Sequence, residues 1–129
     1  MKMIFVVDDT NINLIAAEEA LSDDYNVITL SSASRMFVIL NKVIPDLILL
    51  DILMPDMDGF EAMEKMKSDT KYADIPVIFL TSKSDENTES RGFKMGAVDF
   101  ISKPFSKPVL LNRIETHLDM ESKIRERTE

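Results

Sequence analysis

The sequence predicts a single α/β domain in which a parallel β-sheet carries helices on both faces. Five short apolar runs alternate along the chain with segments of helical periodicity. The runs are rich in branched and aromatic residues and mostly lack alternation with polar residues, which is typical of strands covered on both faces. Strands that alternate with helices in this way indicate a doubly wound parallel sheet.

The apolar runs predict strands at 3–7, 25–30, 47–50, 77–80 and 98–101. Apolar residues at helical spacing predict a helix after each strand. They are Leu14, Ala17 and Leu21, with polar Glu18 as the exception; Ala33, Met36, Phe37 and Leu40; Phe60, Met63 and Met66; and Leu110, Leu111, Ile114 and Leu118. Segment 85–96 is weakly patterned, with Gly96 as its expected C-terminal stop. Ser106 is the expected cap of the last helix, with Pro108 in its first turn.

Composition excludes several classes of protein. The chain has 129 residues, a net charge of −8, no cysteine and one histidine. The acidic balance disfavours nucleic-acid binding by this domain, and a thiolate zinc site or a multi-histidine metal site is excluded. No apolar run approaches the ~20 residues that span a membrane, and the start is no secretory signal. We expect a cytoplasmic domain over 1–120, with 121–129 as a charged tail or a helix extension.

Acidic and polar residues gather where the predicted strands end. They are Asp8 and Asp9 after the first strand, Asp51 after the third, Thr81 and Ser82 after the fourth, and Lys103 after the fifth. Parallel sheets bind ligands at this carboxyl edge. If the first and third strands are neighbours, their three carboxylates lie within ~5 Å and repel one another. A divalent cation resolves this repulsion, and an all-oxygen ligand set favours Mg²⁺, with Mn²⁺ as the alternative.

One carboxylate among these groups is predicted to be a phosphoryl acceptor. A cation, an ammonium group and a hydroxyl around Asp51 suit a doubly negative phosphoryl group, and carboxylates form aspartyl-phosphates as nucleophiles. Taken singly, each residue is explained by a turn, a helix cap or a solvated acid. Their joint occurrence at the ends of four strands favours the phosphoryl-transfer interpretation.

Four motifs resemble the receiver domain of two-component response regulators of the chemotaxis-regulator type. They are VDD at 7–9, LLDILMPDMDG at 49–59, LTS at 80–82 and FISKPF at 100–105, and the resemblance covers residues 2–118. It implies a flavodoxin-like fold: five parallel strands in the order 2-1-3-4-5, with five helices on two faces. It also implies a sensor histidine kinase, or a phosphotransfer protein, as the phosphoryl donor.

The resemblance also assigns roles to residues. It implies Asp51 as the phosphorylation site, Lys103 and Thr81 as its catalytic partners, Thr81 and Phe100 as the switch pair, and Asp8, Asp9, Asp51 and the main-chain carbonyl of Leu53 as metal ligands. The Lys103–Pro104 bond is expected to be cis, as is usual in the family. Such a domain phosphorylates and dephosphorylates itself but turns over no external substrate in the conventional sense. The family also dimerises through the fourth helix, fifth strand and fifth helix, so a homodimer through that face is an expectation.

Other classes fit less well. A haloacid-dehalogenase-type phosphatase needs a second aspartate where this chain has Leu53, and a flavin-binding relative would bring a phosphate against the acidic loop 8–13. A pseudo-receiver, which binds proteins but is never phosphorylated, stays open as the alternative. From position alone, Leu53 and Lys83 are expected to slow loss of the phosphate by hindering the attacking water.

Overall fold

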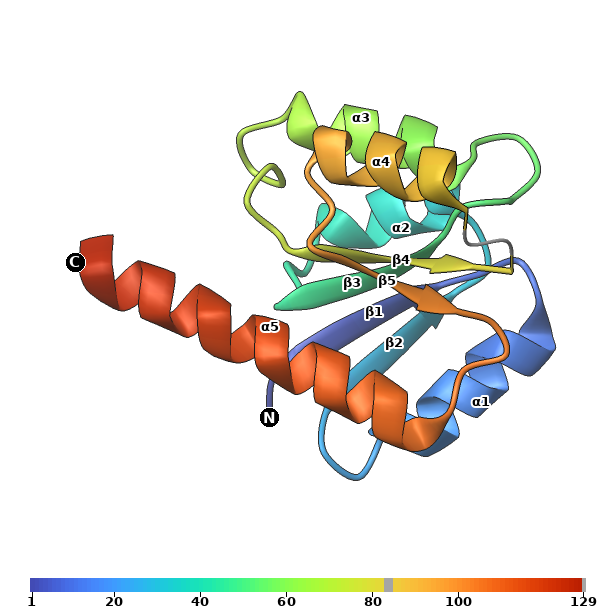
Figure 1. Ribbon diagram of the computed structural model, residues 1–129, viewed down its shortest axis with the longest axis horizontal. Coiled ribbons are helices and arrows are strands. Elements are labelled where there is room, and N and C mark those ends of the chain that lie inside the picture. The colour runs from blue at the N-terminus through green and yellow to red at the C-terminus, as the bar shows by residue number, and fades with distance from the viewer. Residues whose placement is uncertain (83–84, 129) are drawn as a thin grey trace.

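The strands form one parallel sheet at the centre of the computed structural model, which describes residues 1–82 and 85–128 (Figure 1). They are β1 (Met3–Val7), β2 (Asn26–Leu30), β3 (Leu47–Asp51), β4 (Val77–Thr81) and β5 (Asp99–Ser102). Their order is β2-β1-β3-β4-β5, and every neighbouring pair is parallel. The predicted fold class and strand order are confirmed, with strand boundaries that differ by at most one residue.

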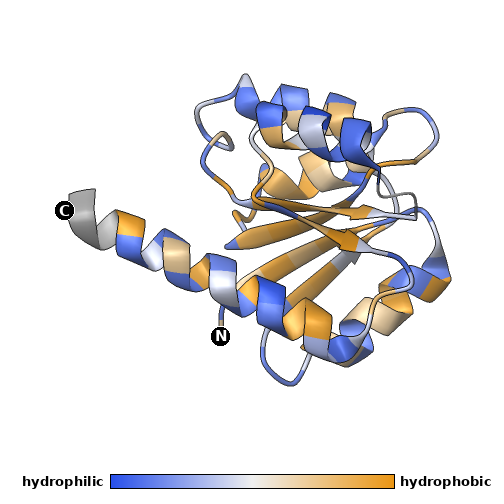
Figure 2. Ribbon diagram, in the orientation of Figure 1, coloured by the Kyte–Doolittle hydropathy of each residue, from blue (hydrophilic) through white to orange (hydrophobic). Residues whose placement is uncertain are grey.

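The helices cover both faces of the sheet. Helices α2 (Ala33–Leu40), α3 (Gly59–Lys67) and α4 (Glu86–Met95) lie on one face, and α1 (Asn11–Leu21) and α5 (Lys107–Thr128) lie on the other (Figure 1). The sheet therefore separates two apolar cores. Along β1, Phe5 and Val7 pack into the first core, whereas Ile4 and Val6 pack into the second. Figure 2 shows mostly hydrophobic strands between helices in which hydrophobic and hydrophilic residues alternate.

Capping residues mark the ends of three helices. The Asp58 side chain accepts a hydrogen bond from the Glu61 N–H at 2.8 Å, and the Glu61 carboxylate accepts one from the Asp58 N–H, so a capping box starts α3. Gly96 ends α4 in the left-handed conformation, as predicted. The Ser106 hydroxyl accepts a weak hydrogen bond from the Val109 N–H at 3.4 Å at the start of α5.

The last helix is longer than the sheet it covers. Leu110, Ile114 and Leu118 bury one stripe of α5, and the helix then continues to Thr128. Its 22 residues span about 33 Å at 1.5 Å per residue, and its C-terminal part projects beyond the sheet (Figure 1). Residues 121–128, the described part of the expected tail, continue α5 as a helix. Nowhere in the described ranges is a helix both long enough and apolar enough to cross a bilayer.

Gly59 closes the loop between β3 and α3. Its N–H donates to the carbonyl of Ile52 at 2.7 Å, which folds the loop back onto the end of β3. A Cβ at this position would lie 2.5 Å from the carbonyl oxygen of Asp51 and 2.9 Å from the Cα of Ile52. Both are main-chain atoms and cannot rotate away. The glycine is therefore required by the close approach of α3 to the strand end.

Replacing this glycine should destabilise the protein. Alanine is the better helix former, so without a clash Gly59→Ala would stabilise the fold slightly. The contact with main-chain atoms reverses the sign, and we expect the free energy of unfolding to fall by about 1–3 kcal/mol, as for overpacking. Urea denaturation measures this, with Glu64→Ala on the exposed side of α3 as the matched control. An unchanged or higher midpoint for Gly59→Ala would show that the loop is not held at this distance.

Candidate functional site

Three carboxylates meet at the carboxyl edge of the sheet. Asp8 and Asp9 follow β1, and Asp51 is the last residue of the neighbouring strand β3. One oxygen from each lies within 4.8 Å of the others. Asp8 and Asp51 are buried, whereas Asp9 is exposed. The sheet order thus brings together the acids that the sequence analysis grouped.

The Asp8 carboxylate is fixed by several donors. One oxygen accepts the Thr10 N–H at 2.9 Å, and the other accepts Asn13 Nδ2 at 3.1 Å. Its own N–H donates to the carbonyl of Leu30 on β2 at 3.0 Å. Asn13 was not among the predicted site residues. Its position in the first turn of the helix after β1, five residues beyond Asp8, is the feature that would have identified it.

Lys103 links the two buried carboxylates. Its Nζ lies 2.9 Å from Asp51 Oδ1 and 3.3 Å from Asp8 Oδ2, and its side chain is only 13% exposed. It comes from the chain just after β5, where its N–H donates to the Thr81 carbonyl at 2.8 Å. The following peptide bond, Lys103–Pro104, is cis, as expected. The lysine therefore reaches from the end of β5 across to β3.

Burial has the largest single effect on the pKa of both Asp51 and Lys103. Burial raises the pKa of Asp51, the hydrogen bond from Lys103 lowers it, and the charge of Asp8 raises it again, with a result of about 6. Burial would lower the pKa of Lys103, but the hydrogen bond and charge of Asp51, with those of Asp8, raise it above its usual value. The site therefore holds more negative charge than its one ammonium group neutralises.

The carboxylates fit a hard cation. Asp51 Oδ2 is buried and has no hydrogen-bond partner among the described residues. A buried oxygen without a partner is costly, and the Asp51 carboxylate shares this edge of the sheet with those of Asp8 and Asp9. Three oxygen donors with excess negative charge and no nitrogen or sulfur form the ligand set that Mg²⁺ or Mn²⁺ prefers.

Of the remaining predicted residues, Thr81 and Leu53 lie next to the strand end that carries Asp51. Thr81 is buried at the end of β4, next to β3. Leu53 lies in the loop after Asp51, and its side chain is 68% exposed. Phe100 lies in β5 opposite Phe79, on the face covered by α4, away from the carboxylates. Lys83, which was expected to flank the site, lies outside the described residues.

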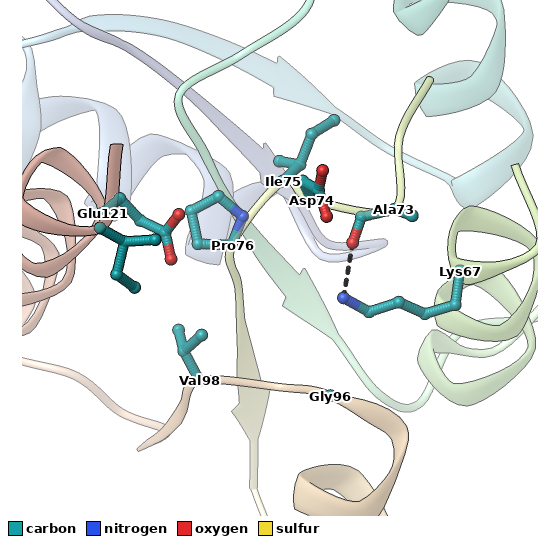
Figure 3. A pocket seen from close by; sticks show the side chains of 9 residues that line it. Lys67, Ala73, Asp74, Ile75, Pro76, Gly96, Val98 and Glu121 are labelled. Carbon is teal, nitrogen blue, oxygen red and sulfur yellow. Dashed lines mark hydrogen bonds between the residues drawn. The ribbon is translucent and has the colours of Figure 1, made fainter. Parts of the chain in front are cut away.

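A surface hollow of about 520 Å³ lies at the other edge of the sheet. Pro76 and Val98, which precede β4 and β5, and Ile124 of α5 line it (Figure 3). Lys67 Nζ donates to the Ala73 carbonyl at 2.7 Å in its wall. The carboxylates are at the ends of the strands and this hollow is at their starts, so the two are separate.

Comparisons with known proteins place this geometry in a family. The family model described as response regulator receiver domain matches residues 4–115. A probable cyclic di-GMP phosphodiesterase of Vibrio cholerae is 41% identical over 115 residues, which cover 89% of this chain and 26% of that protein. The response regulator PleD of Caulobacter vibrioides is 34% identical over 88% of this chain and 25% of its own length. The chain thus spans about a quarter of these two relatives.

A solved structure has the same architecture. The chemotaxis protein CheY4 of Vibrio cholerae superposes with a TM-score of 0.85 at 26% identity, covering 90% of this chain and 98% of that one. The match to the family model covers the three-carboxylate edge and the whole of the five strands except Met3, the first residue of β1. The chain belongs to the response regulator receiver domain family of two-component signalling.

Proposed function

We propose that this domain accepts a phosphoryl group on Asp51 and that phosphorylation changes the surface presented to a partner. The observation that carries this proposal is the environment of the Asp51 carboxylate. One oxygen binds Lys103 at 2.9 Å, while the other is buried without a hydrogen-bond partner beside Asp8 and Asp9. A carboxylate held by one oxygen, with its second oxygen free to react, suits a nucleophile better than a structural ion pair.

The chemistry follows from these contacts. An oxygen of Asp51 attacks the phosphorus of a phosphohistidine, the P–N bond breaks, and the imidazole keeps the electron pair and takes up a proton. The product is a mixed anhydride on Asp51, which water later hydrolyses. Lys103 would stabilise charge on the phosphoryl oxygens, and the Thr81 hydroxyl would bond one of them. Mg²⁺ or Mn²⁺, held by Asp8, Asp9, Asp51 and the Leu53 carbonyl, would supply further positive charge when bound.

The donor and the output are proposed from the family. Receiver domains interact with histidine kinases, and we propose a histidine kinase or a phosphotransfer protein as the donor here. Most of the length of the two longer relatives lies outside the region that matches this chain. Phosphorylation is therefore proposed to act on an output domain or on a separate partner. A homodimer through α4, β5 and α5 is a further proposal, for which Phe93 and Val109 offer exposed apolar surface.

Phosphorylation can be tested directly by mass. Incubation with Mg²⁺ and acetyl phosphate should add the mass of one phosphoryl group, and Asp51→Asn should abolish this addition. Asp56→Asn is the matched control, because Asp56 is exposed in the same loop and asparagine tolerates its positive φ of 69°. If the parent chain stays unmodified, the domain is an interaction module; addition to the Asp51→Asn variant would place the acceptor elsewhere.

The lifetime of the phosphate tests the residues near the acceptor. Replacing Leu53 and Lys83 with serine should shorten the lifetime several-fold, because an apolar side chain and a long cation would no longer hinder the attacking water. Leu53→Ser alone should account for part of the change. The decay of the phosphorylated mass after removal of acetyl phosphate measures it. An unchanged lifetime in the double variant would refute the hindrance.

The raised pKa of Asp51 predicts a pH dependence of stability without metal. The folded-state pKa is about 6 and the usual value is 3.8, so the folded state holds the proton more tightly. The contribution of Asp51 to the free energy of unfolding therefore falls as the pH rises from about 4 to 6. Above pH 6 the ionised carboxylate destabilises the folded state by its full amount. In the presence of a metal chelator at pH 8, the free energy of unfolding of Asp51→Asn should exceed that of the parent by on the order of 2–3 kcal/mol.

The pH dependence of this difference in stability provides an internal control. The advantage of Asp51→Asn in urea denaturation should shrink as the pH falls towards 4, because the parent carboxyl then becomes neutral too. Asp56→Asn is the control variant, because it leaves the buried carboxylates unchanged. Added Mg²⁺ should raise the midpoint of the parent and not that of Asp51→Asn, since a ligand that binds the folded state stabilises it. Parallel pH curves for parent and variant would contradict the raised pKa.

A further inference from the structure

Helix α4 is held to the sheet through a glycine. Of its ten residues, all within the described part of the chain, only Gly92 is buried. The large apolar residue beside it, Phe93, is 48% exposed. A glycine inside a helix costs about 1 kcal/mol relative to alanine. A buried glycine in the last turns of a mostly polar helix therefore calls for a physical reason.

The backbone does not supply that reason. Gly96 is the only glycine with a positive φ among the described residues, so Gly92 has a conformation open to other residues. Its carbonyl accepts the N–H groups of Gly96 and Ala97 where the helix ends. An alanine carbonyl would accept the same bonds. Neither dihedral freedom nor hydrogen bonding thus requires glycine at this position.

The space beside Gly92 is occupied by the Phe100 ring. A Cβ at 92 would overlap Cζ of Phe100 and would lie 3.1 Å from its Cε1 and 3.2 Å from Cδ2 of Phe79. The Phe100 ring lies between its neighbours on β4 and α4, with ring centroids 5.6 Å from Phe79 and 5.1 Å from Phe93. The missing side chain at 92 therefore makes the room in which this ring lies.

We propose that Gly92 is a positioning residue for the aromatic switch: its lack of a side chain lets Phe100 lie inward beneath α4, and any side chain there shifts the ring out of this place. The proposal rests on the proposed function and on the switch pair of Thr81 and Phe100 that the family resemblance implies, in which Phe100 moves as Thr81 bonds the phosphoryl group. A phosphoryl group shifts a conformational equilibrium only through contacts that differ between the two states. When a side chain at position 92 fills this space, the Phe100 ring has the same position in both states. Helix α4 then no longer responds to phosphorylation.

A double-mutant cycle in urea tests the packing without any phosphorylation. Gly92→Ala should lower the unfolding midpoint of the parent. In a Phe100→Ala background, where no ring opposes the methyl group, the same substitution should lower the midpoint less or raise it. Lys94→Ala, at an exposed position of the same helix, should have the same effect in both backgrounds. Additive effects of Gly92→Ala and Phe100→Ala would overturn the proposal. Loss of folding in Gly92→Ala that Phe100→Ala restores would support it.

A second measurement separates the positioning role from the proposed function. With Mg²⁺ and acetyl phosphate, intact mass reports phosphorylation, and hydrogen exchange of peptides from α4 and β5 reports the response. We expect Gly92→Ala to take up the phosphoryl group but to lose the exchange change seen in the parent and in Lys94→Ala. A full exchange response in Gly92→Ala would overturn the positioning role. A parent chain without phosphorylation would refute the proposed function, and the double-mutant cycle would still decide the Gly92–Phe100 contact.

Discussion

The ammonium group of Lys103, shared between two buried carboxylates, is the interaction on which the functional end of this domain depends. Its contacts with Asp51 at 2.9 Å and Asp8 at 3.3 Å join side chains from the ends of three strands. Removing the Lys103 ammonium group would leave two buried carboxylates without a compensating charge, which is strongly destabilising. One positive charge does not neutralise three carboxylates, however. The excess negative charge gives the site its preference for cations.

The strand order makes this interaction geometrically available. β1 and β3 are direct neighbours, so Asp8 and Asp51 end adjacent strands, and β4 alone separates β3 from β5. Thr81 lies at the end of this intervening strand, and its carbonyl accepts the Lys103 N–H. β4 also carries Phe79, two residues earlier, against which the Phe100 ring packs. The same strand therefore contacts both the charged edge and the aromatic packing beneath α4.

The sequence was most informative where burial is complete. β3 and β4 are buried at every residue, so they stand out as short unbroken apolar runs. The residues alone did not decide between the two common strand orders; the order came with the family resemblance. Boundaries shifted because hydrogen bonding continues past the apolar run, so that Asp51 is the last residue of β3 rather than the first after it.

Part of the site was also predictable from the sequence. Carboxyl ends of parallel strands meet at one edge, so the convergence of Asp8, Asp51 and Lys103 follows from the fold class. Asn13 was not identified, although its place five residues after Asp8 makes their contact a local one. Gly92 was not identified because its contact with Phe100 depends on how α4 packs in three dimensions. Around α4 the hydrophobic pattern is even misleading. Apolar Phe93 is half exposed, whereas the small Gly92 is the residue that packs inward.

The extension of α5 has a mechanical consequence. The helix is anchored by its buried stripe from Leu110 to Leu118, and the ten residues that follow are held in one hydrogen-bonded rod with the anchored part. A rod fixed at one end acts as a lever: a small tilt at the anchor moves the far tip by a larger distance. Slight repacking of α5 on the sheet would thus displace the far end of the helix by an amplified distance.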